Sequence, residues 1–314
     1  MSSSAAAQRR DADRRDAATG QAVRRLGSGL PFLVPFVVVA LLFLVIPVLY
    51  GLWLSFTEQS LMGRGGFVGL DNYVEALGDE TMWATLGHTI LFTVMSTVPL
   101  VLLALVMALL VYVGIPGQWF WRLAFFAPYL LPVAVVVQVW TWLFNSDVGF
   151  VNYWIQQVGL DKVGWLTDVD VAMWSIVILT VWWTVGFNFL LYLSSLQAIP
   201  DLLYEAAEVD GAGFWRKIWS VTLPQLRGTT VLVATLQVIA SLKIFDQMFI
   251  AFNGGSGPEG STRPILQYIY DTGFTNYRMG YASAMSYIFF VVIIVITVAF
   301  QLLTRARKES GNER

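Results

Sequence analysis

The chain of 314 residues contains no cysteine and only one histidine, His88. The absence of cysteine excludes disulfide bonds and thiolate metal sites, and it removes redox chemistry as a guide to the compartment. A lone histidine builds a zinc site only with several carboxylates beside it. We therefore expect His88 to have a structural or solvent-facing role, and we predict no metal site.

The chain also lacks the phosphate-binding pattern G-x-x-x-x-G-K-[ST]. The nearest glycine-rich segment, Gly254–Ser261, contains no lysine. We expect that the chain is not an enzyme, hydrolyses no ATP and binds no cofactor of its own. Charged residues make up only 13% of the chain, and the formal net charge is −2. The net charge gives little information about binding partners. We do not expect the chain to bind a nucleic acid.

Hydrophobic residues dominate, at 57% of the chain with a mean hydropathy of +0.65. Apolar runs of about 20 residues or more, enough to cross a bilayer, fall at about 31–56, 86–113, 119–145, 169–196, 228–252 and 280–304. Membrane β-strands would instead alternate over about ten residues. The sequence predicts an all-α membrane protein with six transmembrane helices surrounded by lipid.

Lys and Arg are distributed unevenly between the two sides of these runs. With a cytoplasmic N-terminus, 14 of the 19 basic residues lie on the inner side. The outer side receives only Arg64, Lys162, Arg263 and Arg278, and Lys243 lies within a run. The positive-inside rule therefore predicts a multi-pass protein of the plasma or inner membrane with both termini in the cytoplasm.

The chain divides into a membrane domain and two tails. Residues 1–28 are rich in Ser, Ala, Arg and Asp and predict a disordered cytoplasmic tail. Residues 29–305 form the six-span domain with a cytoplasmic loop at 197–226, and residues 306–314 form a second tail. A signal peptide is the alternative for the N-terminal end, but the first apolar stretch reaches about 25 residues without a small-x-small cleavage site. We expect it to remain as the first span.

Three loops face outward in this arrangement. The first, near 57–85, is acidic, and the second, 145–168, contains Phe150, Tyr153, Trp154 and Trp165. Such aromatic residues are typical of a headgroup-depth belt, and contacts with a soluble partner are the alternative. The third, 253–278, opens on a glycine cluster that must break the preceding helix. A short helix over 265–270 follows.

One polar, helix-forming segment, Glu205–Pro224, lies between two apolar runs on the cytoplasmic side. Pro200 and Asp201 predict a helix stop followed by an N-cap, and Gly211 permits a sharp change of direction. Beyond it, an apolar face predicts a second helix lying under the membrane. That face consists of Phe214, Trp215, Ile218 and Trp219.

This helix-turn-helix suits the docking of a soluble protein. Small alanines keep its surface shallow, and Glu205 offers a carboxylate to an incoming Arg or Lys. An ordinary interfacial helix is the alternative. The candidate docking residues are Glu205, Ala206, Ala207, Asp210, Gly211, Leu223 and Pro224.

The spacing of these residues resembles the EAA loop of ABC importer permease subunits, in the carbohydrate branch of the binding-protein-dependent systems. Phe67–Tyr73 is similar to that branch's first outer loop, and Phe245-Asp246 with Asn253–Gly255 is similar to its fifth span and outer loop. Val221 stands where the family often has Ile, a volume-conserving change. The resemblance covers nearly all of 30–305.

The resemblance implies the type I ABC importer permease fold and half of a heterodimeric pore. The implied partners are a second permease subunit, two ATP-binding subunits that use ATP and Mg, and an extracytoplasmic solute-binding protein. The implied substrate is a sugar, such as a maltose-like oligosaccharide, or glycerol phosphate. The loop implied to couple the ATPase to the pore is 197–226.

Polar residues inside the spans are candidates for the substrate pathway, because buried polar groups are costly and tend to face a cavity or a partner helix. Thr180, Thr184 and Asn188 share one helical face, and Gln237 and Ser241 share another. Phe187, with Trp182 and Trp183, supplies aromatic surface for a sugar. Hydrogen bonding between helices is the alternative role for the polar groups.

Lys243 is a charged residue within the fifth run, where insertion costs roughly 2.5–3.5 kcal/mol at mid-membrane. Asp246 lies three residues on, within pairing reach on a helix. We predict an ion pair between them at the outer mouth. Direct contact with substrate is the alternative.

Two other functions are alternatives to ATP-driven import. An ion-coupled secondary transporter would need intramembrane carboxylates, and Asp246 is the only acidic residue well inside a span. A membrane enzyme acting on lipid-linked sugars would need paired carboxylates or a metal cluster near one interface, and the sequence shows neither.

Overall fold

The computed structural model describes residues 33–63 and 65–310, and these contain helices, turns and isolated β-bridges but no strand. A helix satisfies its own backbone N–H and C=O groups, which lipid cannot do. The predicted all-α class is confirmed. The predicted tail 1–28 and residues 311–314 lie outside the described residues. The last helix, α14 (Met279–Ser310), continues past the predicted end at 304.

Four described helices are long and apolar enough to cross a membrane: Leu33–Leu54, Glu80–Tyr112, Val169–Gln197 and Met279–Thr304. The first contains the π-helical turn η1 (Leu41–Val45) and α2 (Ile46–Leu54). The second and third are α4 and α8. Helix α4 begins at Glu80 rather than at 86, because the Asp79 carboxylate accepts hydrogen bonds from the N–H groups of Thr81 and Met82 and so caps an earlier turn.

The third predicted span, 119–145, is not one continuous helix. Helix α5 (Gln118–Phe126) and the 3₁₀ turn η2 (Ala127–Leu130) meet α6 (Val133–Leu143) at a bend of 98°. Leu131, which precedes Pro132, has extended backbone angles, as a residue before proline prefers. Proline also offers no N–H to continue the helix. The segment predicted as the third span is therefore a bent helix pair, and its assignment as a single span stays a prediction.

The fifth predicted span, 228–252, is also interrupted. A π-helical turn, η3 (Ile218–Thr222), leads into α11 (Leu223–Leu242), and a separate helix, α12 (Asp246–Ala251), follows a break at Phe245. The described helices therefore supply four spans, or five if the bent pair counts as one. The count of six stays a prediction.

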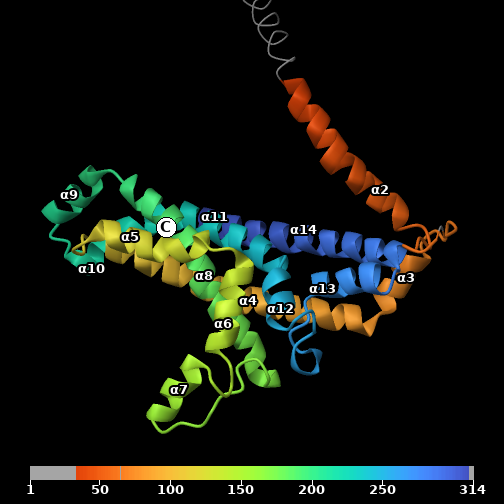
Figure 1. Ribbon diagram of the computed structural model, residues 1–314. Helices are drawn as coiled ribbons and strands as arrows, with labels where there is room; N and C mark the ends of the chain where they lie inside the picture. The colour runs from red at the N-terminus through yellow and green to blue at the C-terminus, as the bar shows by residue number, and fades with distance from the viewer. Residues whose placement is uncertain (1–32, 64, 311–314) are drawn as a thin grey trace, which may run out of the picture.

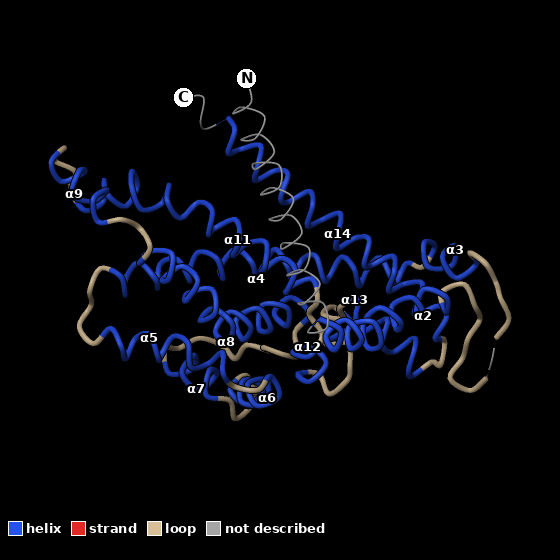
Figure 2. The backbone as a smooth tube through the Cα atoms, turned by 90° about the horizontal axis from the view of Figure 1, so that it is seen from above, coloured by secondary structure: helices blue, strands red, loops and turns tan. Residues whose placement is uncertain are grey.

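The bundle is built around α4 and α8, with α11 beside them (Figure 1). Ala104 and Ala108 of α4 are fully buried in one cluster with Phe189 and Leu196 of α8. Small residues let two membrane helices approach closely. In Figure 1, α2 leads away from the bundle and α10 lies beside α9, and both views show α9 at the end opposite α3 (Figure 2).

The three loops predicted to face outward contain short helices. Helix α3 (Asp71–Gly78) lies in the first loop, and α7 (Phe150–Gln157) lies in the second. In the third, Asn253 has a positive φ of 51°, directly after α12, and the 3₁₀ turn η4 (Pro258–Gly260) follows. Helix α13 (Ile265–Tyr270), with the π-helical turn η5 (Asp271–Thr275), confirms the predicted short helix.

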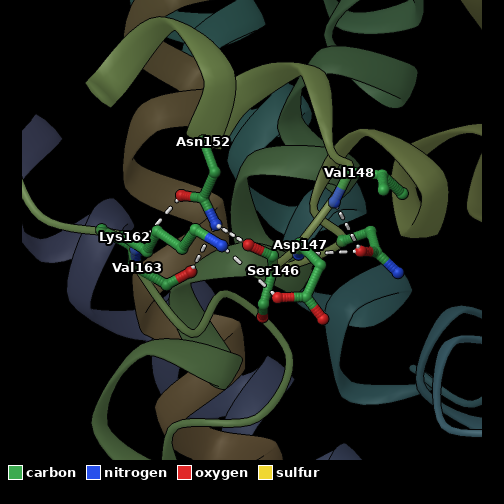
Figure 3. A network of polar contacts seen from close by, with 7 residues as sticks. Ser146, Asp147, Val148, Asn152, Lys162 and Val163 are labelled. Atoms are coloured by element: carbon green, nitrogen blue, oxygen red, sulfur yellow. Dashed lines mark hydrogen bonds and ion pairs between the residues drawn. The ribbon is translucent and has the colours of Figure 1, made fainter. Parts of the chain in front are cut away.

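The loop at 145–168 is organised by Asn152, a buried residue of α7. Its side-chain nitrogen donates to the carbonyls of Ser146 and Val163, and its oxygen accepts from the N–H of Val163 (Figure 3). The indole N–H of Trp165 donates to the same oxygen at 3.1 Å. Trp165 is therefore a packed residue of this loop, whereas Phe150, Tyr153 and Trp154 are exposed.

Asp79 connects three elements at the end of the bundle where α4 begins. Its carboxylate accepts hydrogen bonds from the hydroxyls of Tyr268 in α13, at 2.5 Å, and Tyr281 in α14, at 2.8 Å. Burial raises the pKa of Asp79, but these two hydrogen bonds and those from Met82 and Thr81 outweigh it, so its pKa is lower than usual. The carboxylate ties α4, α13 and α14 together.

Candidate functional site: a helical elbow and a polar cavity

The segment 201–224 forms a helix, a tight turn and a second helix, here called the elbow. It consists of α9 (Asp201–Val209), the turn at 210–213, α10 (Phe214–Lys217), η3 and the first two residues of α11. Asp201 is the first helical residue, and Pro200 occupies the N-cap position without a side-chain cap. The predicted N-cap role of Asp201 was wrong. The second half runs through η3 directly into α11 rather than forming an independent helix.

Gly211 ends α9 in a Schellman turn. Its φ is +71°, its N–H donates to the carbonyl of Glu208 at 2.9 Å, and the N–H of Ala212 donates to the carbonyl of Ala207 at 2.8 Å. This pair of bonds satisfies carbonyls that a helix end would otherwise leave open. A residue with a Cβ is disfavoured at this φ, so glycine sets the turn.

The seven candidate docking residues lie along the elbow. Glu205, Ala206, Asp210 and Gly211 are exposed, and Ala207 is half-buried. Leu223 and Pro224 begin α11, with proline in the first turn, where its missing N–H costs nothing. Val209 at the tip of α9 is 89% exposed. The elbow thus presents an acidic and apolar surface outside the bundle.

The elbow is attached to the bundle by tyrosine contacts. The hydroxyls of Tyr204 in α9 and Thr222 in η3 are 3.1 Å apart and hydrogen-bonded. The ring of Tyr204 lies 6.5 Å from that of Tyr112 at the end of α4. Lys217 forms an ion pair with Glu208 across the turn. A displacement of α9 would therefore act on both α4 and α11.

All eight residues predicted for a substrate pathway border one cavity of about 440 Å³, within the range of roughly 300–1,000 Å³ typical of small-molecule sites. Helix α8 contributes four of them and α11 two, and the other two lie at the C-cap of α11 and at the first residue of α12. They are Thr180, Thr184, Phe187, Asn188, Gln237, Ser241, Lys243 and Asp246.

A chain of hydrogen bonds crosses the buried side of this cavity. Asn188 Nδ2 donates to Gln237 Oε1 at 3.1 Å, and Gln237 Nε2 donates to Ser241 Oγ at 3.0 Å. Ser241 Oγ also lies 3.0 Å from Ser96 Oγ of α4. These groups therefore bond between helices and border the cavity at once. Bordering a cavity and hydrogen bonding between helices were the two alternative roles considered from the sequence. The structure shows that the same side chains do both.

The predicted ion pair between Lys243 and Asp246 is not formed, so that prediction was wrong. Among the described residues, the ion pairs join Lys162 to Asp147, Lys217 to Glu208, Arg263 to Asp271 and Arg278 to Glu75. Helix α11 ends before Lys243 and α12 begins at Asp246, so the two residues do not share one helical face. Both side chains are exposed at the cavity.

Sequence reasoning missed Tyr129 and Ser96 as residues at or next to the cavity. Tyr129 belongs to η2, and its ring stacks on Phe187 with centroids 5.4 Å apart. Trp183 borders the cavity, whereas Trp182 contacts Trp140 and does not. Packing of η2 against α8 positions Tyr129, and no periodicity in the sequence marked it. His88 contacts the carbonyl of Arg263 through Nδ1 at 3.2 Å, a structural position.

Comparison with known proteins decides the family. Residues 100–309 match the family described as "Binding-protein-dependent transport system inner membrane component". The chain belongs to this family. This permease chain is therefore an integral, multi-pass membrane protein with the importer permease fold.

Individual relatives agree with this assignment. The chain is 32% identical to the probable ABC transporter permease protein YurN of Bacillus subtilis, over 90% of this chain and 96% of YurN. It is 30% identical to the trehalose/maltose transport system permease protein MalF of Thermococcus litoralis, over 90% and 95%. A bacterial alginate ABC transporter, solved with an alginate pentasaccharide-bound periplasmic protein, superposes with a TM-score of 0.77 at 23% identity, covering 91% and 96%.

Proposed function

We propose that this permease forms half of the translocation pore of an ATP-driven sugar importer, with the elbow as the contact for an ATPase. The observation that carries the proposal is the elbow itself, an exposed acidic helix ended by a glycine turn and continuous with a pore-lining helix. The sugar assignment is supported by a relative whose name specifies trehalose and maltose, and by the neutral polar and aromatic lining of the cavity.

In the proposed assembly, this chain works with three kinds of protein partner. A second permease subunit completes the pore, and two ATP-binding subunits hydrolyse ATP with Mg. A solute-binding protein delivers the sugar on the outer side. The membrane is the plasma or inner membrane, and the charge bias places both termini and the elbow in the cytoplasm. This chain supplies no cofactor and no catalytic residue.

A mechanical path connects the elbow with the cavity. Closure of the ATPase subunits displaces α9, and the Tyr204–Thr222 hydrogen bond passes the displacement to η3. Helix α11 continues from η3, and Gln237 lies about 21 Å along it from Leu223 at 1.5 Å per residue. Gln237 accepts a hydrogen bond from Asn188 of α8. Movement of the elbow therefore shifts the two helices that line the cavity and rocks the bundles from inward-facing to outward-facing.

The alternative of ion-coupled transport rests on Asp246, which is exposed at the cavity. Uptake of ¹⁴C-labelled maltose, trehalose and cellobiose into vesicles containing the assembled importer separates the two. With ATP present and all ion gradients collapsed by ionophores, the proposal expects full uptake. Uptake that requires an ion gradient and does not depend on ATP would contradict ATP-driven import and support ion-coupled transport.

Docking at the elbow is tested by co-purification with the ATPase subunits. The permease variant that combines Glu205→Ala with Gly211→Pro lacks both the carboxylate and the glycine turn. We expect this double variant to lose the bound ATPase. The matched control is Glu58→Ala, an exposed carboxylate of the first outer loop. Retention of a coupled ATPase by the double variant would contradict the proposed contact.

A further inference from the structure

The elbow changes the sign of its charge at the glycine turn. Its first part, 201–210, contains no basic residue and four acidic ones, Asp201, Glu205, Glu208 and Asp210. Its second part, 214–222, contains Arg216 and Lys217 and no acidic residue. We call these parts the acidic arm and the basic arm. Two arms of opposite charge suit two different partners, because a surface that attracts one arm repels the other.

The basic arm also exposes large aromatic side chains. Trp215 and Trp219 are each 70% exposed, and Phe214 is 51% exposed. The two tryptophans lie four residues apart, so they point to nearly the same side of the helix. Ile218 is half-buried and Thr222 is buried. The basic arm therefore leans on the permease with one side and leaves its tryptophan side uncovered.

The indole N–H groups of these two tryptophans are not used within the described part of the permease. Trp83, Trp165 and Trp183 each donate an indole N–H to another residue. Trp215 and Trp219 donate to none of the described residues. A ring with an apolar body and an unused polar edge suits the membrane–water interface, where it meets acyl chains and headgroups at once.

Arg216 has no ion-pair partner among the described residues. It is exposed, and none of their four ion pairs includes it, whereas its neighbour Lys217 pairs with Glu208. In the loops predicted to face outward, each described basic residue is paired, namely Lys162, Arg263 and Arg278. A guanidinium group can donate two parallel hydrogen bonds to a phosphate. Arg216 can therefore bind a phosphate that lies outside the chain.

The basic arm lies next to a predicted membrane span. Its η3 turn runs without a break into α11, which contains the start of the predicted fifth span. Leu223, the first residue of α11, is four residues after Trp219, about 6 Å along a helix at 1.5 Å per residue. Basic and aromatic helical segments bind at the headgroup layer, and anionic lipids attract basic residues that lie beside a span.

We propose that the basic arm binds an anionic phospholipid, with Arg216 on the headgroup phosphate and with Trp215 and Trp219 at the boundary between headgroups and acyl chains. The acidic arm stays available to the ATPase. The inference rests on the proposed function, which places the elbow in the cytoplasm, beside the leaflet that carries anionic lipid. The bound lipid then holds one arm of the elbow while the ATPase moves the other.

The first test measures contact with the headgroups. Because the chain has no cysteine, a single Ser220→Cys, next to Trp219, can be labelled with the fluorophore NBD in the importer assembled with cysteine-free partner subunits. The vesicles contain phosphatidylcholine, phosphatidylglycerol and a phosphatidylcholine with a nitroxide on its headgroup. We expect strong quenching at position 220 and little at Val209→Cys, the control at the tip of the acidic arm.

Two results of this measurement would overturn the lipid contact. One is the absence of nitroxide quenching at position 220, or quenching no stronger than at position 209. The other is quenching by aqueous iodide that is lost at position 220 when the ATPase subunits bind, since the tryptophan side would then belong to the ATPase.

The second test measures the preference for anionic lipid. Quenching at position 220 by phosphatidylglycerol with a nitroxide on its acyl chain is compared with quenching by the matching phosphatidylcholine. Loss of one basic contact at a membrane surface weakens binding about fivefold. We expect Arg216→Gln to lower the preference for phosphatidylglycerol by about this factor, and Arg216→Lys to keep it. An equal preference before and after Arg216→Gln would overturn the phosphate contact.

The third test removes the rings and keeps the cation. The permease that combines Trp215→Gln with Trp219→Gln is expected to lose the headgroup quenching at position 220. Trp154→Gln, at an exposed tryptophan of α7, is the control and should leave this quenching unchanged. Undiminished quenching in the double variant would overturn the role of the two tryptophans.

These measurements need neither sugar nor ATP hydrolysis, so they separate the lipid contact from the proposed function. ATP-driven sugar uptake without quenching at position 220 would refute the lipid contact and leave import intact. Quenching and lipid preference as expected, in an importer that takes up none of maltose, trehalose and cellobiose, would support the lipid contact and count against the proposed function.

Discussion

Asn188 of α8 donates a hydrogen bond to Gln237 of α11 at 3.1 Å, and both residues are buried beside the cavity. The two helices are far apart in sequence, so this amide pair couples elements that only packing brings together. Through Ser241 and Ser96 the same chain reaches α4. The three central helices of the bundle thus share one polar connection.

A double-mutant cycle at this pair should show positive coupling. Asn188→Ala and Gln237→Ala each leave a buried polar group without its partner. We expect the double variant to lose less stability than the sum of the singles, by about 0.6 kcal/mol and at most ~1.7 kcal/mol, the range of membrane hydrogen bonds. Unfolding of the purified permease in detergent measures it. Additive losses would show that the bond contributes nothing.

Gly211→Ala should weaken the elbow. A Cβ at Gly211 meets no atom within 4 Å, so the cost comes from its positive φ alone, about 1–2 kcal/mol. The elbow turn should open locally, and ATP-driven uptake should fall. Gly213→Ala is the control, since Gly213 has a φ of −70° and equally open space. Similar uptake losses in both variants would contradict this reading of the turn.

Gly186→Ala should separate α5 from α8. A Cβ there would lie 2.3 Å from the carbonyl oxygen of Phe125, a backbone contact that cannot move aside. We expect a loss of about 1–3 kcal/mol from overpacking, measured by thermal unfolding. The control is Gly87→Ala in α4, where nothing lies within 4 Å and a better helix former should stabilise. Equal stability of the two variants would disprove the close approach.

Asp79→Asn should destabilise the end of the bundle where α4 begins, in a pH-dependent way. The native pKa of Asp79 is lowered, so its contribution is present above the unfolded value of about 3.9 and is lost as pH falls through the lower native value. We expect a loss near 1 kcal/mol at pH 7, since Asp79 is partly exposed.

Melting curves of wild type and Asp79→Asn from pH 3 to pH 8 test this expectation. The difference in melting temperature between wild type and Asp79→Asn should become smaller below about pH 4. Glu80→Gln, an exposed neighbour in the first turn of α4, serves as control and should melt like wild type. A difference that stays constant over the whole range would rule out the carboxylate charge as the cause.

The sequence predicted much of the candidate site because its signals were local. The glycine turn at Gly211 and the helical face of Thr180, Thr184 and Asn188 depend on neighbouring residues in the chain. Tyr129 escaped prediction because packing of η2 against α8 brings it to the cavity, and these two segments are distant in sequence. Lys243 and Asp246 were paired on an assumed helix that the structure interrupts.

The sequence by itself determined the class of this protein. Long apolar runs without water to solvate the backbone must become helices, and a glycine at positive φ must turn the chain. Only the tertiary structure decided which polar groups meet across α4, α8 and α11, and that the stacked rings of Tyr129 and Phe187 face one cavity. The physical reason is that backbone conformation follows neighbours in the chain, whereas contacts between helices follow the packing of segments distant in sequence.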